Sequence, residues 1–138
     1  MRNAQTLWEL LAALTIVGTL AAIATPPAVQ SRDRATARAA ATTLRATLAS
    51  ARDVALAHAS AALVVVDAAL STVTVVVDRD TVLRHALAGD LRARLTASRD
   101  TIRFGPTGRA FGASNTTLVI RAGVAAETVT VSRVGRVR

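Results

Sequence analysis

Two histidines and a pair of aspartates are the side chains of this 138-residue chain that could support catalysis. His58 and His85 lie far apart in the sequence, and neither has the spacing of a metal-ligand pair. We expect His58 on the packed face of a helix. Asp78 and Asp80 flank an arginine in a predicted hairpin turn, where aspartate is common. Because the chain also has no cysteine, we predict that it is not an enzyme and has no metal or cofactor.

A carboxylate in an apolar segment is the first feature that calls for a functional explanation. Glu9 is the single charge in the apolar run from Thr6 to Thr25. A helix of that length covers about 30 Å and can span a bilayer. A carboxylate costs on the order of 2.5 to 3.5 kcal/mol at the centre of such a span, and less near its end. Glu9 is explained either by the dipole of the helix start at the interface, or by a positive group on a neighbouring subunit.

The flanks of this run predict its orientation. Arg2 lies on the short side, so the positive-inside rule places the N-terminus in the cytoplasm and the bulk of the chain across the membrane. A cleavable secretory signal is the alternative, with Arg2 as its basic region and residues 22–24, Ala-Ile-Ala, as its cleavage site. Glu9 argues against that alternative, because a signal's apolar core rarely carries a charge.

The second candidate site is basic and lies at the other end of the chain. The sequence has 17 basic and 9 acidic residues, and every basic residue is arginine. Nine arginines and two carboxylates fall between Arg92 and Arg138, which leaves +7 of the net charge of +8 in that stretch. In an extended segment Arg136 and Arg138 point the same way, about 6.6 Å apart.

With Arg109 and Arg133 nearby, these two arginines could neutralise several phosphates of a nucleic acid in a sequence-tolerant, salt-sensitive way. The alternative is a solvated chain end that keeps the protein soluble.

A long helix and a β-rich region must position these residues. Residues 28–62 contain no glycine or proline, and one face repeats at spacings of three and four, while arginines occupy the opposite face. The packed face comprises Leu44, Leu48, Ala51, Ala55, His58 and Ala62, and the basic face Arg32, Arg34, Arg38 and Arg45. We therefore predict one helix of about fifty residues, half in lipid and half on a globular domain.

Beyond the helix, β-branched runs separated by turn residues predict antiparallel strands. The predicted strands are 63–66, 72–77, 101–104, 116–121 and 128–132, and residues 90–99 fit a loop, a strand or a helical turn equally well. The predicted fold class is α+β, a long N-terminal helix packed on an antiparallel β-sheet head.

The N-terminal residues resemble a known signal. Thr-Leu-Trp-Glu-Leu-Leu at 6–11, followed by Gly18 and Pro26, resembles the class III signal and N-terminal helix of type IV pilins and pseudopilins. The resemblance implies that a prepilin peptidase cuts between Ala4 and Gln5 and that the new amine on Gln5 is methylated. It also implies that Glu9 faces the amine of an adjacent subunit during assembly. Ala4 stands where the family usually has Gly, and Gln5 where it usually has Phe.

The C-terminal half is similar to the GspH/FimT branch of that family. Residues 48–55, 102–109, 118–120 and 129–138 carry the likeness, which with the N-terminus covers nearly the whole chain. In some FimT-like minor pilins a closing Gly-Arg-x-Arg motif is implicated in binding DNA, and residues 135–138 have that form. On this resemblance Arg109, Arg133, Arg136 and Arg138 are the candidate DNA-binding residues.

The resemblance implies a pilin-like organisation. Residues 1–4 would be a leader, 5–27 a single transmembrane helix in the bacterial inner membrane, and 28–138 a periplasmic domain with a helix at 28–62 and a β-rich part at 63–138. The chain would be a minor pseudopilin or pilin, a structural subunit of a type II secretion pseudopilus or a type IV pilus, acting in protein secretion. Its partners would be other pilin subunits, the prepilin peptidase, the inner-membrane assembly machinery and the membrane. The alternative is a DNA-binding minor pilin that serves DNA uptake in natural transformation.

Overall fold

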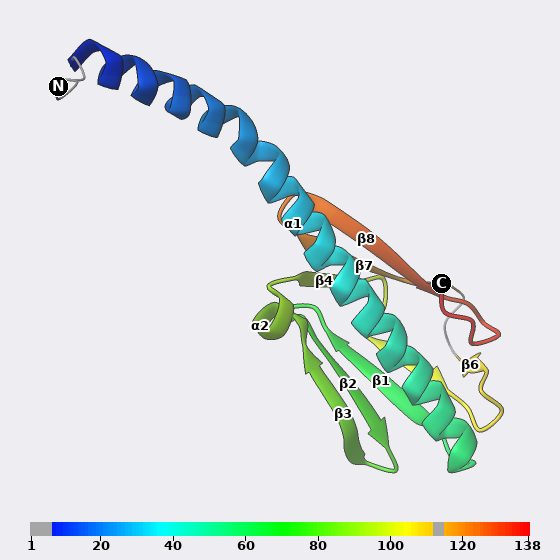
Figure 1. Cartoon of the computed structure of the whole chain (residues 1–138). Helices are drawn as coiled ribbons and strands as arrows, with labels where there is room; N and C mark the ends of the chain where they lie inside the picture. The colour runs from blue at the N-terminus through cyan, green and yellow to red at the C-terminus, as the bar shows by residue number, and fades with distance from the viewer. Residues whose placement is uncertain (1–6, 112–114) are drawn as a thin grey trace. The chain divides into compact units, whose positions relative to one another are not determined.

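A computed structural model describes residues 7–111 and 115–138, and for residues 23–26 it describes the backbone alone. The chain divides into two compact units, Met1–Arg32, here called the N-terminal unit, and Asp33–Arg138, here called the head. The first helix, α1 (Leu7–Ala57), begins in the N-terminal unit and ends in the head (Figure 1).

The N-terminal unit exposes its apolar side chains. The exposed large residues here are Leu7, Trp8, Leu10, Leu11, Leu14, Ile16, Val17, Leu20 and Val29. The hydroxyls of Thr15 and Thr19 donate hydrogen bonds of 2.8 Å to the carbonyls of Ala12 and Ile16, so these polar groups are satisfied inside the helix. Within the described residues, α1 is long and apolar enough to cross a membrane.

In the head, α1 buries the face that the sequence periodicity predicts. Leu44, Leu48, Ala51 and Ala55 are each at most 1% exposed. The helix ends at Ala57 and not at residue 62, because Ala59 adopts a positive φ of 48° and Ala62 begins the first strand. His58 follows the helix end and is exposed, so its predicted place on the packed face was wrong.

Two antiparallel sheets complete the head. The five-stranded sheet has the order β3-β2-β1-β5-β6, and the three-stranded sheet has the order β4-β7-β8. The strands of the first are β1 (Ala62–Asp67), β2 (Thr72–Val77), β3 (Asp80–Ala86), β5 (Thr101–Phe104) and β6 (Ala110–Phe111). Those of the second are β4 (Arg94–Ala97), β7 (Thr116–Ala122) and β8 (Ala125–Val131). The predicted α+β fold is thereby confirmed.

One hydrophobic core joins α1 to both sheets. Along β1 and β7 every second residue is buried, as expected for strands with one face on a core. The largest buried side chains are Leu44, Leu48, Val64, Val73, Val75, Leu87, Leu95, Ile102, Phe104, Leu118, Ile120 and Val129. Only Phe104 is aromatic in this set, so β-branched and leucine side chains do most of the packing.

The segment between the two sheets resolves the ambiguous stretch at residues 90–99. A short helix, α2 (Leu87–Leu91), ends at Arg92 in the left-handed conformation, and β4 follows. Ser71 ties this segment to the turn before β2: its carbonyl accepts a 3.0 Å hydrogen bond from the Leu87 N–H, and its Oγ accepts one of 3.1 Å from the Leu95 N–H. The two sheets are thus linked through one buried serine.

Candidate functional site

The C-terminal residues form a short hairpin with β8. The backbone groups of Thr130 and Arg138 exchange two hydrogen bonds of 2.9 and 3.0 Å, and the Ser132 N–H donates to the Arg136 carbonyl at 2.9 Å. The Gly135 N–H closes the turn on the Ser132 carbonyl at 2.9 Å. Figure 1 shows the C-terminus returning to the end of β8. The backbone of the candidate DNA-binding motif is therefore held by hydrogen bonds to the second sheet.

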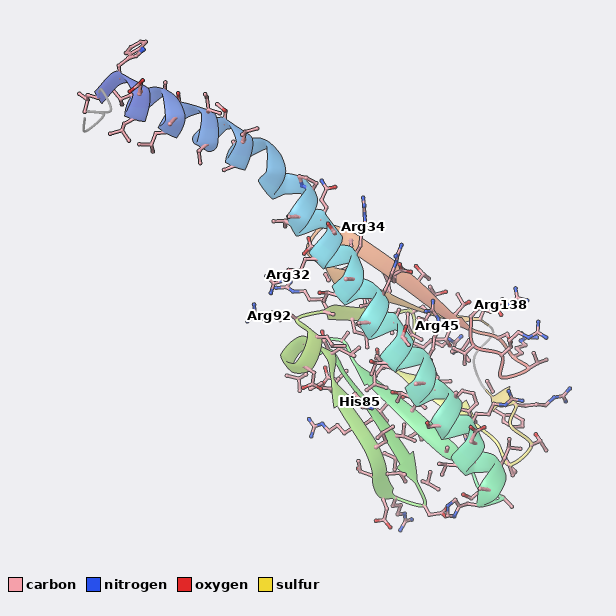
Figure 2. All side chains as sticks on the ribbon, in the orientation of Figure 1. Arg32, Arg34, Arg45, His85, Arg92 and Arg138 are labelled. Carbon is pink, nitrogen blue, oxygen red and sulfur yellow. The ribbon has the colours of Figure 1, made fainter. Side chains whose placement is uncertain are left out.

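This hairpin separates apolar from basic side chains. Val137 pairs with Val131 and packs against the core, whereas Arg136 and Arg138 on either side of it are exposed. The two arginines line one shallow groove of about 440 Å³, here called the arginine groove (Figure 2 labels Arg138). Its lining residues are Asn115, Thr130, Ser132, Val134, Arg136 and Arg138. The groove therefore combines two guanidinium groups with hydroxyl and amide side chains, all of which can donate hydrogen bonds to an anion.

Gly135 allows the hairpin to approach the loop after β5. It has a φ of +77°, and a Cβ at this position would collide with the carbonyl oxygen of Gly108. Gly108 itself has a φ of +71° and closes a turn by donating to the Gly105 carbonyl at 2.9 Å. Both glycines are therefore required by conformation, and Gly135 also by the space available.

The contact between these glycines brings Arg109 toward the hairpin, which itself carries Arg133. Arg109 directly follows Gly108 and is exposed, and Arg133 is exposed in the hairpin turn. None of Arg109, Arg133, Arg136 and Arg138 forms an ion pair with a carboxylate in the part of the chain that the structure describes. Their charge is thus available to an anionic partner.

Arg52 of α1 is a residue of this region that sequence reasoning missed. Its Nε is buried without a hydrogen-bond partner, 2.9 Å from where a Cβ on Gly108 would lie and 3.6 Å from the corresponding point at Gly135. Arg52 therefore packs against both glycine turns. The likeness at residues 48–55 includes Arg52 but gave it no role in the site, because its contact with the glycine turns depends on how the loops fold over the helix.

The other candidate site is the start of α1. Glu9 lies in the first turn of the helix, in the N-terminal unit, with an exposed side chain. A carboxylate there is favoured by the dipole of the helix. The predicted cleavage residues Ala4 and Gln5 lie outside the described residues.

The architecture of a long N-terminal helix with two antiparallel sheets in the head defines a type IV pilin-like protein. The family model described as Type II transport protein GspH matches residues 40–135, and the chain belongs to this family. It is thus a pilin-like protein of the GspH/FimT type with a structural role of the minor pseudopilin or pilin kind, as the sequence resemblance indicated. Comparison with curated proteins gives no match.

Solved structures show the same fold. The type IV minor pilin FimU of Pseudomonas aeruginosa PAO1 matches with a TM-score of 0.63 and 16% identity, over 76% of this chain and 88% of FimU. A second crystal form of FimU gives a TM-score of 0.61 at 15% identity, over 73% and 90% of the two chains. The minor pseudopilin EpsH from the type 2 secretion system of Vibrio cholerae gives 0.60 and 15% identity, over 74% and 94%.

Proposed function

We propose that this protein is a minor subunit of a type II secretion pseudopilus or a type IV pilus, assembled through α1 and acting in protein secretion. The observation that carries the proposal is the pairing of a GspH-family head with a helix whose apolar side chains are exposed. Such a helix needs an apolar environment, which a bilayer supplies before assembly and neighbouring helices supply within a filament.

The proposal includes the path of the subunit to the filament. A prepilin peptidase removes residues 1–4, and the amine of Gln5 is methylated. Residues 5–27 hold the protein in the inner membrane as a single pass, with residues 28–138 in the periplasm. Inner-membrane assembly machinery then transfers the subunit to a filament of other pilin subunits. The net positive charge at Arg2 supports the orientation.

Glu9 is the proposed assembly determinant. Burying its carboxylate in an apolar filament core costs free energy unless a cation on a neighbouring subunit neutralises the charge. We expect Glu9→Ala to leave the amount of membrane-bound protein unchanged and to reduce its incorporation into sheared filaments by tenfold or more. Thr15→Ala is the matched control, since its hydroxyl bonds within its own helix. Normal incorporation of Glu9→Ala would remove the assigned role of Glu9.

DNA binding is a second candidate function, favoured by the exposed arginines of the hairpin. The arginine groove and its neighbours Arg109 and Arg133 present donors that suit phosphate oxygens. No aromatic residue lies in the described lining of the groove, which favours backbone contacts over base stacking. A subunit with this property would serve DNA uptake in natural transformation.

A salt titration tests this candidate function. The full chain in neutral detergent should retard duplex DNA at about 50 mM salt and lose affinity steeply toward 200 mM. Replacing Arg136 and Arg138 together with Ala should reduce the slope of log affinity against log salt by about two units at most. Arg34→Ala with Arg84→Ala removes the same charge from α1 and β3 and serves as the control. Absence of a shift at low salt would leave secretion as the function to pursue.

A further inference from the structure

The spacing of charges in the N-terminal unit fits one position of the helix in a bilayer. Glu9 and Arg32 are successive charges along α1, and no charged residue lies between them. At 1.5 Å per residue they are about 34 Å apart along the helix, or about 32 Å along the bilayer normal at an average tilt of about 20°. A hydrocarbon core is about 30 Å thick. Both charges can therefore lie at the polar borders together, which extends the lipid-embedded part of the proposed anchor from residue 27 to the residues just before Arg32.

There is little room to slide the helix from this position. A shift of one helical turn, about 5.4 Å, moves either Glu9 or Arg32 into the hydrocarbon. Either shift places a charge where it costs up to a few kcal/mol, with the cost rising toward the centre. Thr15 and Thr19 add no competing preference, since their hydroxyls already donate to carbonyls of the same helix, and Gln30 and Ser31 lie beside Arg32 at the same border.

Trp8 lies beside Glu9, at one end of the uncharged segment 10–31. It is the one tryptophan of the chain, directly precedes Glu9, and is 78% exposed in the first turn of α1. Tryptophan prefers the boundary between headgroups and acyl chains, where the ring is apolar and the indole N–H meets a polar acceptor. Leu10 and Leu11, which follow Glu9, are apolar and exposed, as hydrocarbon-facing side chains should be.

We propose that Trp8 docks at the headgroup boundary of the cytoplasmic leaflet and fixes the depth of the helix, so that Glu9 lies among the headgroups and not in the bilayer interior. This inference rests on the proposed membrane anchor. Its consequence concerns assembly: the carboxylate of Glu9 is presented to a cationic group at the membrane surface, and no charge has to be drawn from the centre of the bilayer. The first residues of α1 thus act as a lipid-recognition element.

Because the chain has one tryptophan, its fluorescence reports the depth of this residue directly. The full chain would be reconstituted into vesicles of phosphatidylcholine and phosphatidylglycerol at a ratio of about three to one. The lipids would carry bromine either at a shallow or at a deep position of the acyl chain. We expect the shallow label to quench Trp8 at least twofold more strongly than the deep label. Stronger quenching by the deep label would overturn the proposal.

A second single-tryptophan variant calibrates the measurement. Trp8→Leu combined with Leu14→Trp moves the indole six residues, or about 9 Å, further along the helix. Leu14 is exposed in the structure, so the change creates no packing conflict. Glu9 and Arg32 are unchanged in this variant and still limit how far the helix can slide, so the order of the two quenchers should reverse. If both variants show the same order, the helix is not held between these two charges and the depth assigned to Trp8 is wrong.

Glu9→Gln separates the contribution of Trp8 from that of the charge. If Trp8 fixes the depth, the shallow label remains the stronger quencher when the carboxylate becomes an amide. A change to stronger deep quenching would mean that Glu9 sets the depth, against the proposal. Flotation of the vesicles tests the anchor separately: protein that fails to float with lipid refutes the proposed membrane anchor, whereas floating protein with a deep Trp8 refutes this inference alone.

Discussion

The N-terminal unit and the head use similar apolar residues in opposite ways. In the N-terminal unit, leucine, isoleucine and valine side chains are exposed along α1, and Glu9 is the one acidic residue there. In the head the same residue types are buried between α1 and two sheets, and arginines occupy the surface. The N-terminal unit is therefore built for an apolar environment and the head for water. A single helix serves both, because helix formation requires no particular solvent once the backbone groups are paired within it.

The largest expected effect is the loss of membrane association when an arginine replaces an exposed apolar residue of the N-terminal unit. The same kind of substitution in the head is the comparison. Val17 is 64% exposed near the middle of the apolar run, and Leu70 is 59% exposed in the turn between β1 and β2. Val17→Arg should make the free energy of membrane insertion about 2.5 to 3.5 kcal/mol less favourable. It should therefore strongly reduce the carbonate-resistant membrane fraction. Leu70→Arg should change the stability of the head by about 0.5 kcal/mol or less and leave the membrane fraction intact. Equal membrane fractions for the two variants would contradict the assignment of different solvents.

Sequence periodicity predicted the buried parts of this molecule well. The spacing of Leu44, Leu48 and Ala51 identified the packed face of α1, and the alternating runs identified β1, β2, β5, β7 and β8. Each of these elements buries one face. That burial requires apolar residues at regular spacings, and these spacings are what the sequence analysis detected.

The elements that sequence analysis missed lack such a period. Strand β3 pairs with β2 at an edge of the sheet, and its residues 80–82 are all exposed, so no alternation is visible there. Strand β6 has two residues, too few for a pattern. Among strands, local sequence therefore reports contact with the core: the edge strand β8, which has buried residues, was predicted, whereas the edge strand β3, which has none, was missed.

The candidate site was predictable in its residues but not in its geometry. The motif at residues 135–138 can be read directly from the sequence, whereas its hairpin depends on hydrogen bonds to Thr130 and Ser132. The contact of Gly135 with Gly108 and the packing of Arg52 beneath both glycines join segments far apart in the chain. No local pattern encodes such contacts, since each depends on the completed fold.

The next prediction concerns the glycine turns of the head. Gly135→Ala introduces a side chain at a positive φ and against the Gly108 carbonyl, and should destabilise the head by about 1 to 3 kcal/mol. Gly89→Ala is the matched control in α2, where the nearest atom to a new Cβ is 4.0 Å away and alanine favours the helix. Thermal unfolding followed by circular dichroism measures both. A Gly135→Ala variant as stable as Gly89→Ala would show that the two turns can separate freely.

The smallest effects should come from the polar contacts of α1 with the hairpin of β7 and β8. Asp33 accepts a 3.1 Å hydrogen bond from the Val124 N–H through Oδ2, and Arg38 lies 3.7 Å from Glu127, measured from Nε to Oε1. Removing the acceptor in Asp33→Ala should cost about 1 kcal/mol. Arg38→Ala should cost about 0.5 kcal/mol or less, because the arginine side chain is 74% exposed and water screens the pair.

The same unfolding measurement at low and high salt distinguishes these two contacts. The effect of Arg38→Ala should vanish as salt rises, since a solvent-exposed ion pair is screened. The effect of Asp33→Asn isolates charge from hydrogen bonding, because the amide oxygen can still accept from the Val124 N–H. If Asp33→Asn destabilises the head as much as Asp33→Ala, the carboxylate acts through its charge, and the hydrogen bond to the turn is not what holds this hairpin to the helix.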